Sequence, residues 1–277
     1  MTAFVLKIIA SITMLIDHIG AVFPLTFPMY FRYIGRIAFP VYAYMIAQGC
    51  KHTSNINKYL LRLGVFALIS EIPFDLAFGN EISFIRRTNI FYTLFLGTAC
   101  IAVFEKVRVF LSAPKVSMEQ DSEPGIEQKG RIKSKPLCVL LAALLMIPVA
   151  MLGNVLDSDY GTRGVACILV FYFTKPENRI TRTIAAIAII MYMYGYPHIL
   201  FNLISAAGGF IESDFLMAMS IITPNTMLYM FFFALISAIL ICFYNGKPGP
   251  RVKWAFYAFY PVHLAILAMI KYMSGQY

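Results

Sequence analysis

Residues 4–24 read FVLKIIASITMLIDHIGAVFP, an apolar run long enough, as a helix, to cross the hydrocarbon core of a bilayer. Similar runs recur along the chain, and we expect spans at about 4–24, 33–50, 59–79, 89–111, 136–154, 162–175, 182–206, 226–244 and 253–273. A transmembrane barrel would show short alternating segments instead. The sequence therefore predicts an all-α, polytopic helical membrane protein with about nine spans. Eight to ten spans are possible, because 162–175 is short and 182–222 could hold two helices.

The composition fits a chain that lies in lipid. Apolar residues make up 60% of it and charged residues only 13%, whereas charged residues are about a quarter of a typical globular protein. We expect residues 1–277 to form a single integral-membrane domain with a flexible cytoplasmic loop at about 113–135, where mixed charges surround Pro124 and Gly125. The five cysteines are scattered without CxxC spacing, which indicates neither a disulfide framework nor a metal site.

Basic residues are distributed unevenly among the predicted loops. Loops after even-numbered spans carry 13 lysines and arginines, and loops after odd-numbered spans carry 4. Because cytoplasmic loops are enriched in lysine and arginine, we expect the amino terminus in the cytoplasm and, with nine spans, the carboxyl terminus outside. The net charge of +9 is explained in this way. No basic domain or nucleic-acid-binding motif accompanies it, so we expect no nucleic-acid partner.

The first span contains three ionisable residues, Lys7, Asp17 and His18. The spacing of Lys7 and His18 is about three helical turns, so the two side chains face the same way, about 16 Å apart along the axis. Such groups are costly in hydrocarbon and are functional candidates by default. Histidine can accept a proton near neutral pH, which suits a general base for acyl transfer. Lys7, at the cytoplasmic end, would suit a phosphate-bearing donor that enters from the cytosol.

Further charged residues fall in the outer half of the first three predicted spans. Glu71 and Asp75 are one helical turn apart and share a face, and Arg32 and Arg36 have the same spacing. Ion pairing between these two sets would lower the cost of burying each of them. The pattern predicts one polar chamber that opens outward. A purely structural role as counter-ions is the alternative for Arg36, Glu71 and Asp75.

The residue that orients the His18 ring is not obvious from the sequence. Asp17 lies about 100° around the helix from His18, so adjacency alone does not make it the partner. A carboxylate from another span, Glu71 or Asp75, could orient the ring instead.

The other three histidines have plainer interpretations. His198 and His263 lie in aromatic, apolar stretches, where a hydrogen-bonded packing role is the alternative to a functional one. His52 lies in a basic loop, where we expect it to be solvated.

Several longer motifs stand out: LKII at 6–9, IDHIG at 16–20, IGRIAFP at 34–40, KYLLRL at 58–63, FALISEIPFD at 66–75, DYG at 159–161 and YPVHL at 260–264. Together they resemble the TraX family, strongly over about residues 1–100 and more weakly beyond. The namesake of that family is a conjugal-transfer membrane protein that acetylates the amino terminus of pilin. The resemblance therefore implies acetyl transfer at a bacterial membrane.

A looser likeness extends to membrane acyltransferases of the acyltransferase-3 and heparan-glucosaminide acetyltransferase type. These proteins carry Arg-x10-His in their first span, take acyl-CoA from the cytoplasm and have a ten-span core. Lys7 and His18 have the same spacing, with lysine in place of arginine. That replacement keeps the charge but loses the planar fork of the guanidinium group.

Residues and resemblance together predict a membrane-embedded acyltransferase that uses acetyl-CoA as co-substrate and needs no metal. The expected catalytic set is polar and lies in the outer half of the spans: His18 as general base, with Asp17, Glu71 and Asp75. Two cations are expected to contact the cofactor, Lys7 and Arg36.

The expected acceptor is an amine or hydroxyl of an envelope or secreted molecule, such as a pilin amino terminus or a glycan. The expected location is the bacterial cytoplasmic (inner) membrane, as a multi-pass protein with a cytoplasmic amino terminus. A small-solute or proton-coupled transporter, which would use the same acidic and histidine residues as a relay, is the alternative. A non-catalytic partner of a secretion or pilus apparatus is a third hypothesis.

Overall fold

The computed structural model describes residues 1–79, 81–112, 135–174, 178–195, 224–250 and 252–275. Within these ranges the chain is all-α and contains no β-strand. The helices, in chain order, are α1 (Ala3–Val22), α2 (Tyr30–Gly35), α3 (Ala38–His52), α4 (Ile56–Phe78), α5 (Ile90–Ser112), α6 (Lys135–Val155), α7 (Gly161–Phe173), α8 (Arg179–Ile190), the π-helical turn η1 (Met191–Gly195), α11 (Pro224–Cys242) and α12 (Lys253–Met273).

Local sequence signals set several helix ends. The side chains of Thr2, Asn55 and Asn178 accept hydrogen bonds from backbone N–H groups in the first turns of α1, α4 and α8. Such side chains satisfy N–H groups that have no partner within the helix. Gly79 ends α4 with a positive φ of 70°, a conformation that a residue with a side chain rarely adopts. Polar caps therefore mark the starts of α1, α4 and α8.

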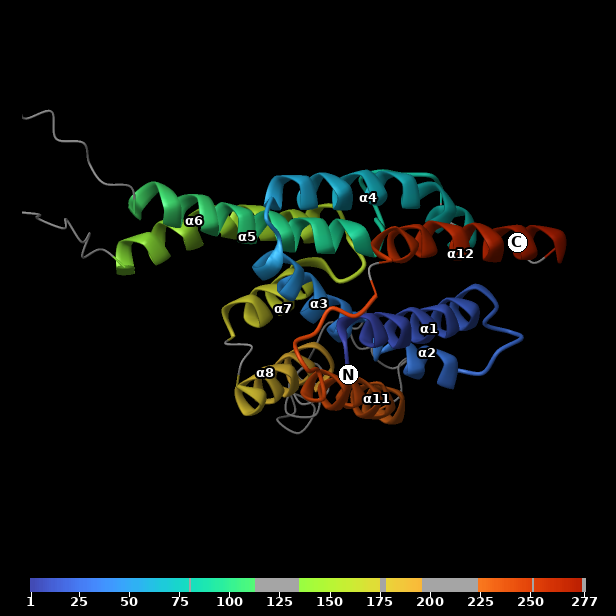
Figure 1. Ribbon diagram of the computed structural model, residues 1–277. Helices are drawn as coiled ribbons and strands as arrows, with labels where there is room; N and C mark the ends of the chain where they lie inside the picture. Colours follow the sequence, from blue (N-terminus) through green and yellow to red (C-terminus); the bar gives the residue numbers. More distant parts are fainter. Residues whose placement is uncertain (80, 113–134, 175–177, 196–223, 251, 276–277) are drawn as a thin grey trace, which may run out of the picture.

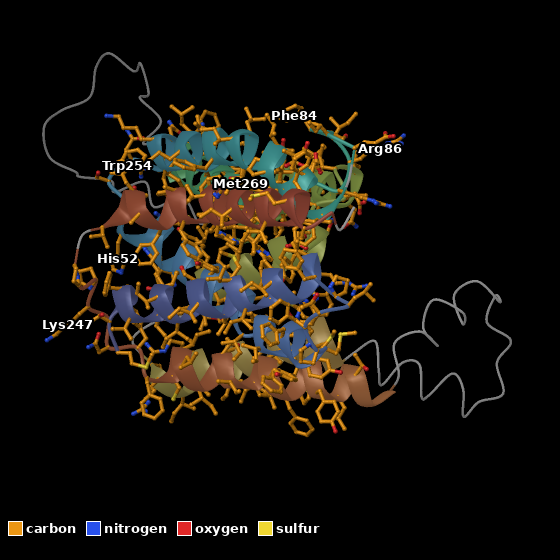
Figure 2. All side chains as sticks on the ribbon, turned by 90° about the vertical axis from the view of Figure 1, so that its right-hand side faces the viewer. His52, Phe84, Arg86, Lys247, Trp254 and Met269 are labelled. Atoms are coloured by element: carbon orange, nitrogen blue, oxygen red, sulfur yellow. The ribbon has the colours of Figure 1, made fainter. Side chains whose placement is uncertain are left out.

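The long helices lie side by side with their axes roughly aligned, and the chain runs along this common axis in both directions (Figure 1). Helix α4 packs against α12 and α5, α1 packs against α2, α3 and α12, and α11 packs against α8. Helices α1 and α12 run parallel, because Lys7 lies over Phe256 while His18, farther along α1, contacts His263, farther along α12. Figure 2 shows His52 and Lys247 at one end of the molecule and Arg86 at the opposite end.

Small residues allow the helices to approach closely. A Cβ atom at Gly97 would lie 2.5 Å from Cδ1 of Ile168, and one at Gly164 would lie 2.5 Å from Cγ2 of Thr93. These two glycines bring α5 and α7 together. Alanines take the same role elsewhere in the core and are buried: Ala10, Ala38, Ala43, Ala47, Ala67, Ala77, Ala234 and Ala238.

Large apolar side chains lie on the outside of the bundle. Exposed examples on α4, α6 and α12 are Leu61, Leu68, Leu76, Leu140, Leu144, Ile147, Ile266, Met269 and Ile270. By length and composition, Ala3–Val22 and Trp254–Met273 are candidates to cross a membrane. Shorter apolar helices are Val139–Val155, Gly161–Phe173 and Leu228–Cys242.

Helices occupy the described parts of all the predicted spans, with one clear difference. The predicted span 33–50 is divided, because α2 ends at Gly35 and α3 begins at Ala38. The turn is tight: the N–H groups of Arg36 and Ile37 donate to carbonyls only three residues earlier. Nearly all of the predicted loop 113–135, and residues 196–222 of the uncertain stretch 182–222, lie outside the described residues.

The close approach of α5 and α7 makes Gly97 sensitive to added volume. We expect Gly97→Leu to lower the free energy of unfolding by about 1–3 kcal/mol, because the new side chain overlaps Ile168. Thermal unfolding of the purified protein measures this loss. Ala265→Leu, at an exposed position of α12, is the matched control and should have little effect. Equal stability of the two variants would contradict the close packing of α5 on α7.

Candidate functional site

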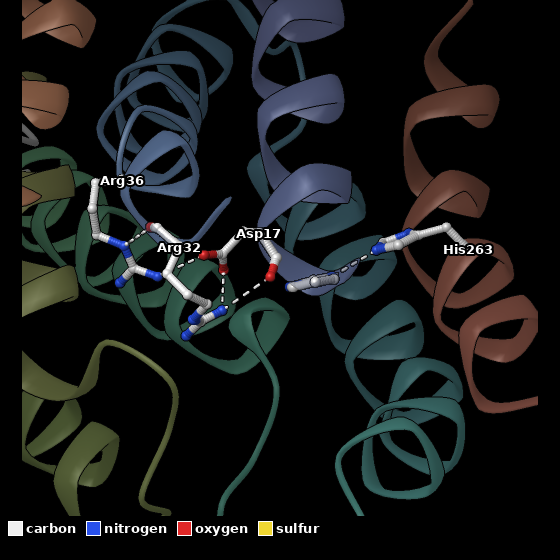
Figure 3. Close-up of polar contacts among 5 residues, drawn as sticks. Asp17, Arg32, Arg36 and His263 are labelled. Atoms are coloured by element: carbon white, nitrogen blue, oxygen red, sulfur yellow. Dashed lines mark hydrogen bonds and ion pairs between the residues drawn. The ribbon is translucent and has the colours of Figure 1, made fainter. Parts of the chain in front are cut away.

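Asp17 is held between two arginines (Figure 3). Its Oδ2 atom lies 2.8 Å from Nη1 of Arg32, and its Oδ1 atom lies 2.9 Å from Nη2 of Arg36. Arg32 also donates to the Asp17 carbonyl at 3.2 Å. The carboxylate packs directly on Gly35, where a Cβ atom would lie 2.2 Å from Cγ of Asp17. This cluster fastens the end of α1 to α2 and to the turn before α3.

His18 points the other way, toward α12. Its Nδ1 atom lies 2.7 Å from Nε2 of His263, and the two ring planes differ by 10° with centroids 5.0 Å apart, so the rings meet edge to edge. Nδ1 of His263 lies 2.7 Å from the carbonyl oxygen of Phe259. The rings of Phe78 and Tyr260 stand edge-on against His18. Both histidines are buried, and in the described part of the chain the hydrogen bond of His18 runs through Nδ1.

Lys7 also faces α12. Its Nζ atom lies 5.5 Å from the centroid of the Phe256 ring, in a cation–π contact. The expectation that Lys7 and His18 share one face of the first helix therefore agrees with the contacts of both residues.

A cavity of about 340 Å³ extends along this face, between α1, α3, α4, α5 and α12. Three groups able to carry positive charge line it: Lys7, His52 and Arg62. Met14, one turn before His18, also lines it, as does Tyr260, whose ring touches His18. The cavity thus extends from a cationic part of its wall to the immediate neighbours of His18.

Aromatic residues surround Arg62 within the cavity wall. Its guanidinium lies 5.7 Å from the ring centroid of Tyr59, and its buried Nε atom has no hydrogen-bond partner in the described residues. Gly49 leaves room for Tyr59, since a Cβ atom there would lie 2.7 Å from the tyrosine hydroxyl oxygen. A cation with unused hydrogen-bonding capacity beside aromatic rings can hold an anionic group that carries a planar ring.

Glu71 and Asp75 have other partners than the sequence suggested. Oε2 of Glu71 accepts hydrogen bonds from the backbone and the side chain of Asn89, and Oδ2 of Asp75 accepts one from the backbone N–H of Ser83 at 2.9 Å. Both carboxylates are fully buried. Through these hydrogen bonds both carboxylates bind the loop that leads from α4 to α5. In the described residues neither of them forms an ion pair with an arginine or a hydrogen bond with His18.

The polar groups therefore form two separate sets of contacts, and the expected pairing of Arg32 and Arg36 with the two α4 carboxylates is wrong. Asp17, which precedes His18 in the sequence, is the carboxylate that both arginines use. Arg36 is consequently occupied by Asp17 and does not line the cavity. Of the two cations expected to contact a cofactor, Lys7 alone lines it.

Three residues of this site were missed by sequence reasoning: His263, Arg62 and His52. His263 is 245 residues from His18 in the chain, and no spacing rule relates them. The available signal was that His18 and His263 lie at similar depths in the predicted spans 4–24 and 253–273, which a nine-span topology makes parallel. Arg62 belongs to the KYLLRL motif but was assigned to no site, and it lines the cavity. His52 is exposed, as expected of a solvated residue, and it also lines the cavity.

Comparisons with known proteins extend the likeness to almost the whole chain. A family model described as TraX protein matches residues 3–271. The probable fimbrial assembly protein FimC, serogroup H1, of Dichelobacter nodosus is 27% identical over 283 residues, which cover 98% of this chain and 96% of that protein. No solved structure matches. The similarity is thus not confined to the first hundred residues.

The Asp17 cluster predicts a large loss of stability when its carboxylate is neutralised. Asp17→Asn would leave Arg32 and Arg36 without their counter-charge, and we expect the free energy of unfolding to fall by about 3–5 kcal/mol. Thermal or denaturant unfolding measures the change. Arg108→Gln removes the exposed Arg108–Glu105 pair as a control and should cost at most about 1 kcal/mol. A loss as small as that of the control would show that the cluster does not fasten α1.

Proposed function

This chain belongs to the TraX family, and on that basis we propose that it is a membrane-embedded acetyltransferase. In this proposal it moves an acetyl group from cytoplasmic acetyl-CoA to an amine or hydroxyl of an envelope or secreted acceptor. One observation carries the proposal: the cavity lined by Lys7 also reaches Tyr260, which contacts His18. The space that would hold the donor therefore reaches a residue in contact with the proposed proton acceptor, while His18 itself does not line it.

The distribution of side chains supports a multi-pass membrane location. Large apolar residues cover the outside of α4, α6 and α12, while alanines and glycines fill helix contacts, as is typical of helices that associate in lipid. Helices α1 and α12 run parallel, which agrees with an odd number of crossings. Nine spans with a cytoplasmic amino terminus meet this condition, and the carboxyl terminus would then lie outside.

The cationic residues of the cavity suit the polyanionic part of CoA. In the proposed topology Lys7, His52 and Arg62 lie near the cytoplasmic side, where the donor is available. Their charges would bind the phosphates, and the neighbouring rings of Tyr59 and Tyr257 could stack on the adenine. The slender pantetheine arm would then extend toward His18. The distance to cover is similar to the roughly 16 Å between Lys7 and His18 along the axis of α1.

The chemical step requires one proton acceptor near the thioester. The acceptor amine or hydroxyl attacks the carbonyl carbon of the acetyl group while the His18 imidazole removes the proton from the attacking nitrogen or oxygen. The tetrahedral intermediate then collapses with cleavage of the C–S bond. His18 returns the proton to the departing sulfur, which leaves as free CoA. The proposed step involves no metal.

The remaining members of the expected site support the chemistry indirectly in this proposal. Asp17 and Arg36 fix the position and rotation of α1, which carries both Lys7 and His18. Glu71 and Asp75 fix the loop after α4, next to Phe78, whose ring touches His18. We therefore assign structural roles to these four residues and assign contact with the reacting groups to His18.

The relative from Dichelobacter nodosus is a probable fimbrial assembly protein. This name, together with the family, supports a subunit of a pilus or fimbria as the acceptor, with its amino terminus as the attacking amine. A synthetic peptide with a free amino terminus, compared with the same peptide amino-terminally blocked and bearing a serine, would separate amine from hydroxyl acylation.

His18 provides the decisive test of the enzymatic proposal. In lipid nanodiscs with labelled acetyl-CoA and these peptides, we expect His18→Ala to reduce acetyl transfer at least about a hundredfold. Binding of acetyl-CoA should be retained, because His18 lies beyond the cationic part of the cavity. Undiminished transfer by this variant would contradict the base assignment, and a wild-type protein that binds no CoA would favour the transporter.

Lys7 tests the donor site separately from the chemistry. We expect Lys7→Gln to weaken acetyl-CoA binding roughly tenfold or more, since one charge-assisted contact to phosphate is lost, whereas Lys7→Arg should bind nearly as well as the wild type. Titration calorimetry measures both. Lys271→Gln removes a cation of α12 that donates to the Ala77 carbonyl and does not line the cavity, so this control should bind normally. Equal affinities for all variants would exclude Lys7 from the donor site.

A further inference from the structure

The two buried histidines and one carbonyl form a continuous chain of hydrogen bonds. His18 Nδ1 lies 2.7 Å from His263 Nε2, and His263 Nδ1 lies 2.7 Å from the Phe259 carbonyl oxygen. The His263 ring is also stacked on the Phe259 ring, with centroids 4.7 Å apart. Both nitrogens of His263 therefore form hydrogen bonds, and the Phe259 ring packs against the His263 ring.

The direction of each hydrogen bond follows from the carbonyl. A carbonyl oxygen only accepts, so Nδ1 of His263 must carry the proton of that bond. In a neutral imidazole the other nitrogen has no proton, so Nε2 of His263 accepts. Nδ1 of His18 must then donate to it. By the same rule, Nε2 of a neutral His18 carries the free lone pair.

The neutral state of both rings is the favoured one in these surroundings. His18 is 7% exposed and His263 is 5% exposed, and aromatic rings contact both. An isolated buried cation is costly. The carboxylate next to His18 in the sequence, that of Asp17, already binds two arginines and is directed away toward α2. It therefore offers no counter-charge for a permanently protonated histidine pair.

We propose that His263 is a positioning residue that holds His18 in the Nδ1–H tautomer and so presents Nε2 as the base. This inference rests on the proposed acetyl transfer. When Nε2 of His18 takes the proton of the acceptor, the ring becomes a cation and its Nδ1–H···Nε2 bond to His263 becomes charge-assisted and stronger. His263 thus stabilises the transient imidazolium while remaining neutral itself. The proton goes on to the CoA sulfur and never needs to reach His263.

Three substitutions of His263 separate hydrogen bonding from packing. His263→Gln places a carbonyl oxygen near the position of Nε2, so the acceptor for His18 is kept. His263→Leu and His263→Phe fill the space without an acceptor, and the second of these retains an aromatic ring if the first folds poorly. Lys271→Gln, also on α12, is the control for a change outside the pair.

Nitrogen NMR of ¹⁵N-histidine-labelled protein reads the tautomer directly, with the His18 signals assigned by their loss in His18→Ala. We expect Nδ1 of His18 to be protonated and Nε2 unprotonated in the wild type and in His263→Gln. In His263→Leu and His263→Phe the proton should move, at least in part, to Nε2. A wild-type His18 protonated on Nε2, or a tautomer unchanged in folded Leu and Phe variants, would overturn the proposal.

Steady-state kinetics of the same variants provide a second test of the positioning role. We expect kcat to fall roughly tenfold to a hundredfold in the Leu and Phe variants and to recover in His263→Gln, with the KM for acetyl-CoA unchanged throughout. Wild-type kcat in a folded Leu variant would contradict the positioning role. Because the NMR reading needs no acetyl transfer, a His263-dependent tautomer in a protein without activity would refute the proposed function and leave the tautomer assignment standing.

Discussion

The two-sided hold of Asp17 by Arg32 and Arg36 determines how the first helix is rotated. The carboxylate is mostly buried, and each of its oxygens faces one guanidinium, so its negative charge is compensated where an isolated charge would be costly. Gly35 permits this contact because it has no side chain. Successive helical residues point about 100° apart. Directing Asp17 toward α2 therefore directs His18 toward α12, and the same rotation turns Lys7 toward Phe256.

A second constraint acts on the other wall of the site. Glu71 and Asp75 hold the loop after α4 through Asn89 and Ser83, and this fixes the end of α4 where Phe78 meets His18. Neither carboxylate touches the histidine pair, yet both determine its surroundings. One oxygen of each carboxylate accepts from a backbone N–H group of this loop, and the other oxygen, Oε1 of Glu71 or Oδ1 of Asp75, is buried without a partner among the described residues.

The positions of the helices could be predicted from the sequence because long, uninterrupted apolar runs favour helices. The break at Arg36 and Ile37 could not be predicted from hydropathy, since IGRIAFP is largely apolar. Pro40 was the available signal, because proline is tolerated in the first turn of a helix and α3 begins two residues before it. The cluster of Asp17 with Arg32 and Arg36 was missed because equal spacing on two other helices suggested a different pairing. The contact between His18 and His263 joins the first and last helices, and only the packing of α1 on α12 reveals it.

A neutral histidine is a reasonable partner for a base in such surroundings. A buried carboxylate would stabilise the imidazolium more strongly, but it would also carry a permanent charge, which is costly in a medium of low polarity unless it is paired. Here the one carboxylate beside His18 in the sequence is already paired with arginines. In the proposed mechanism His263 instead offers a lone pair and a fixed orientation, and its interaction with His18 strengthens only when His18 takes up the proton. An interaction that is stronger in the transition state than in the ground state is the kind that accelerates a reaction. In the proposed acetyl transfer, the arrangement would reconcile a buried, mostly apolar site with a base that becomes charged for part of each cycle.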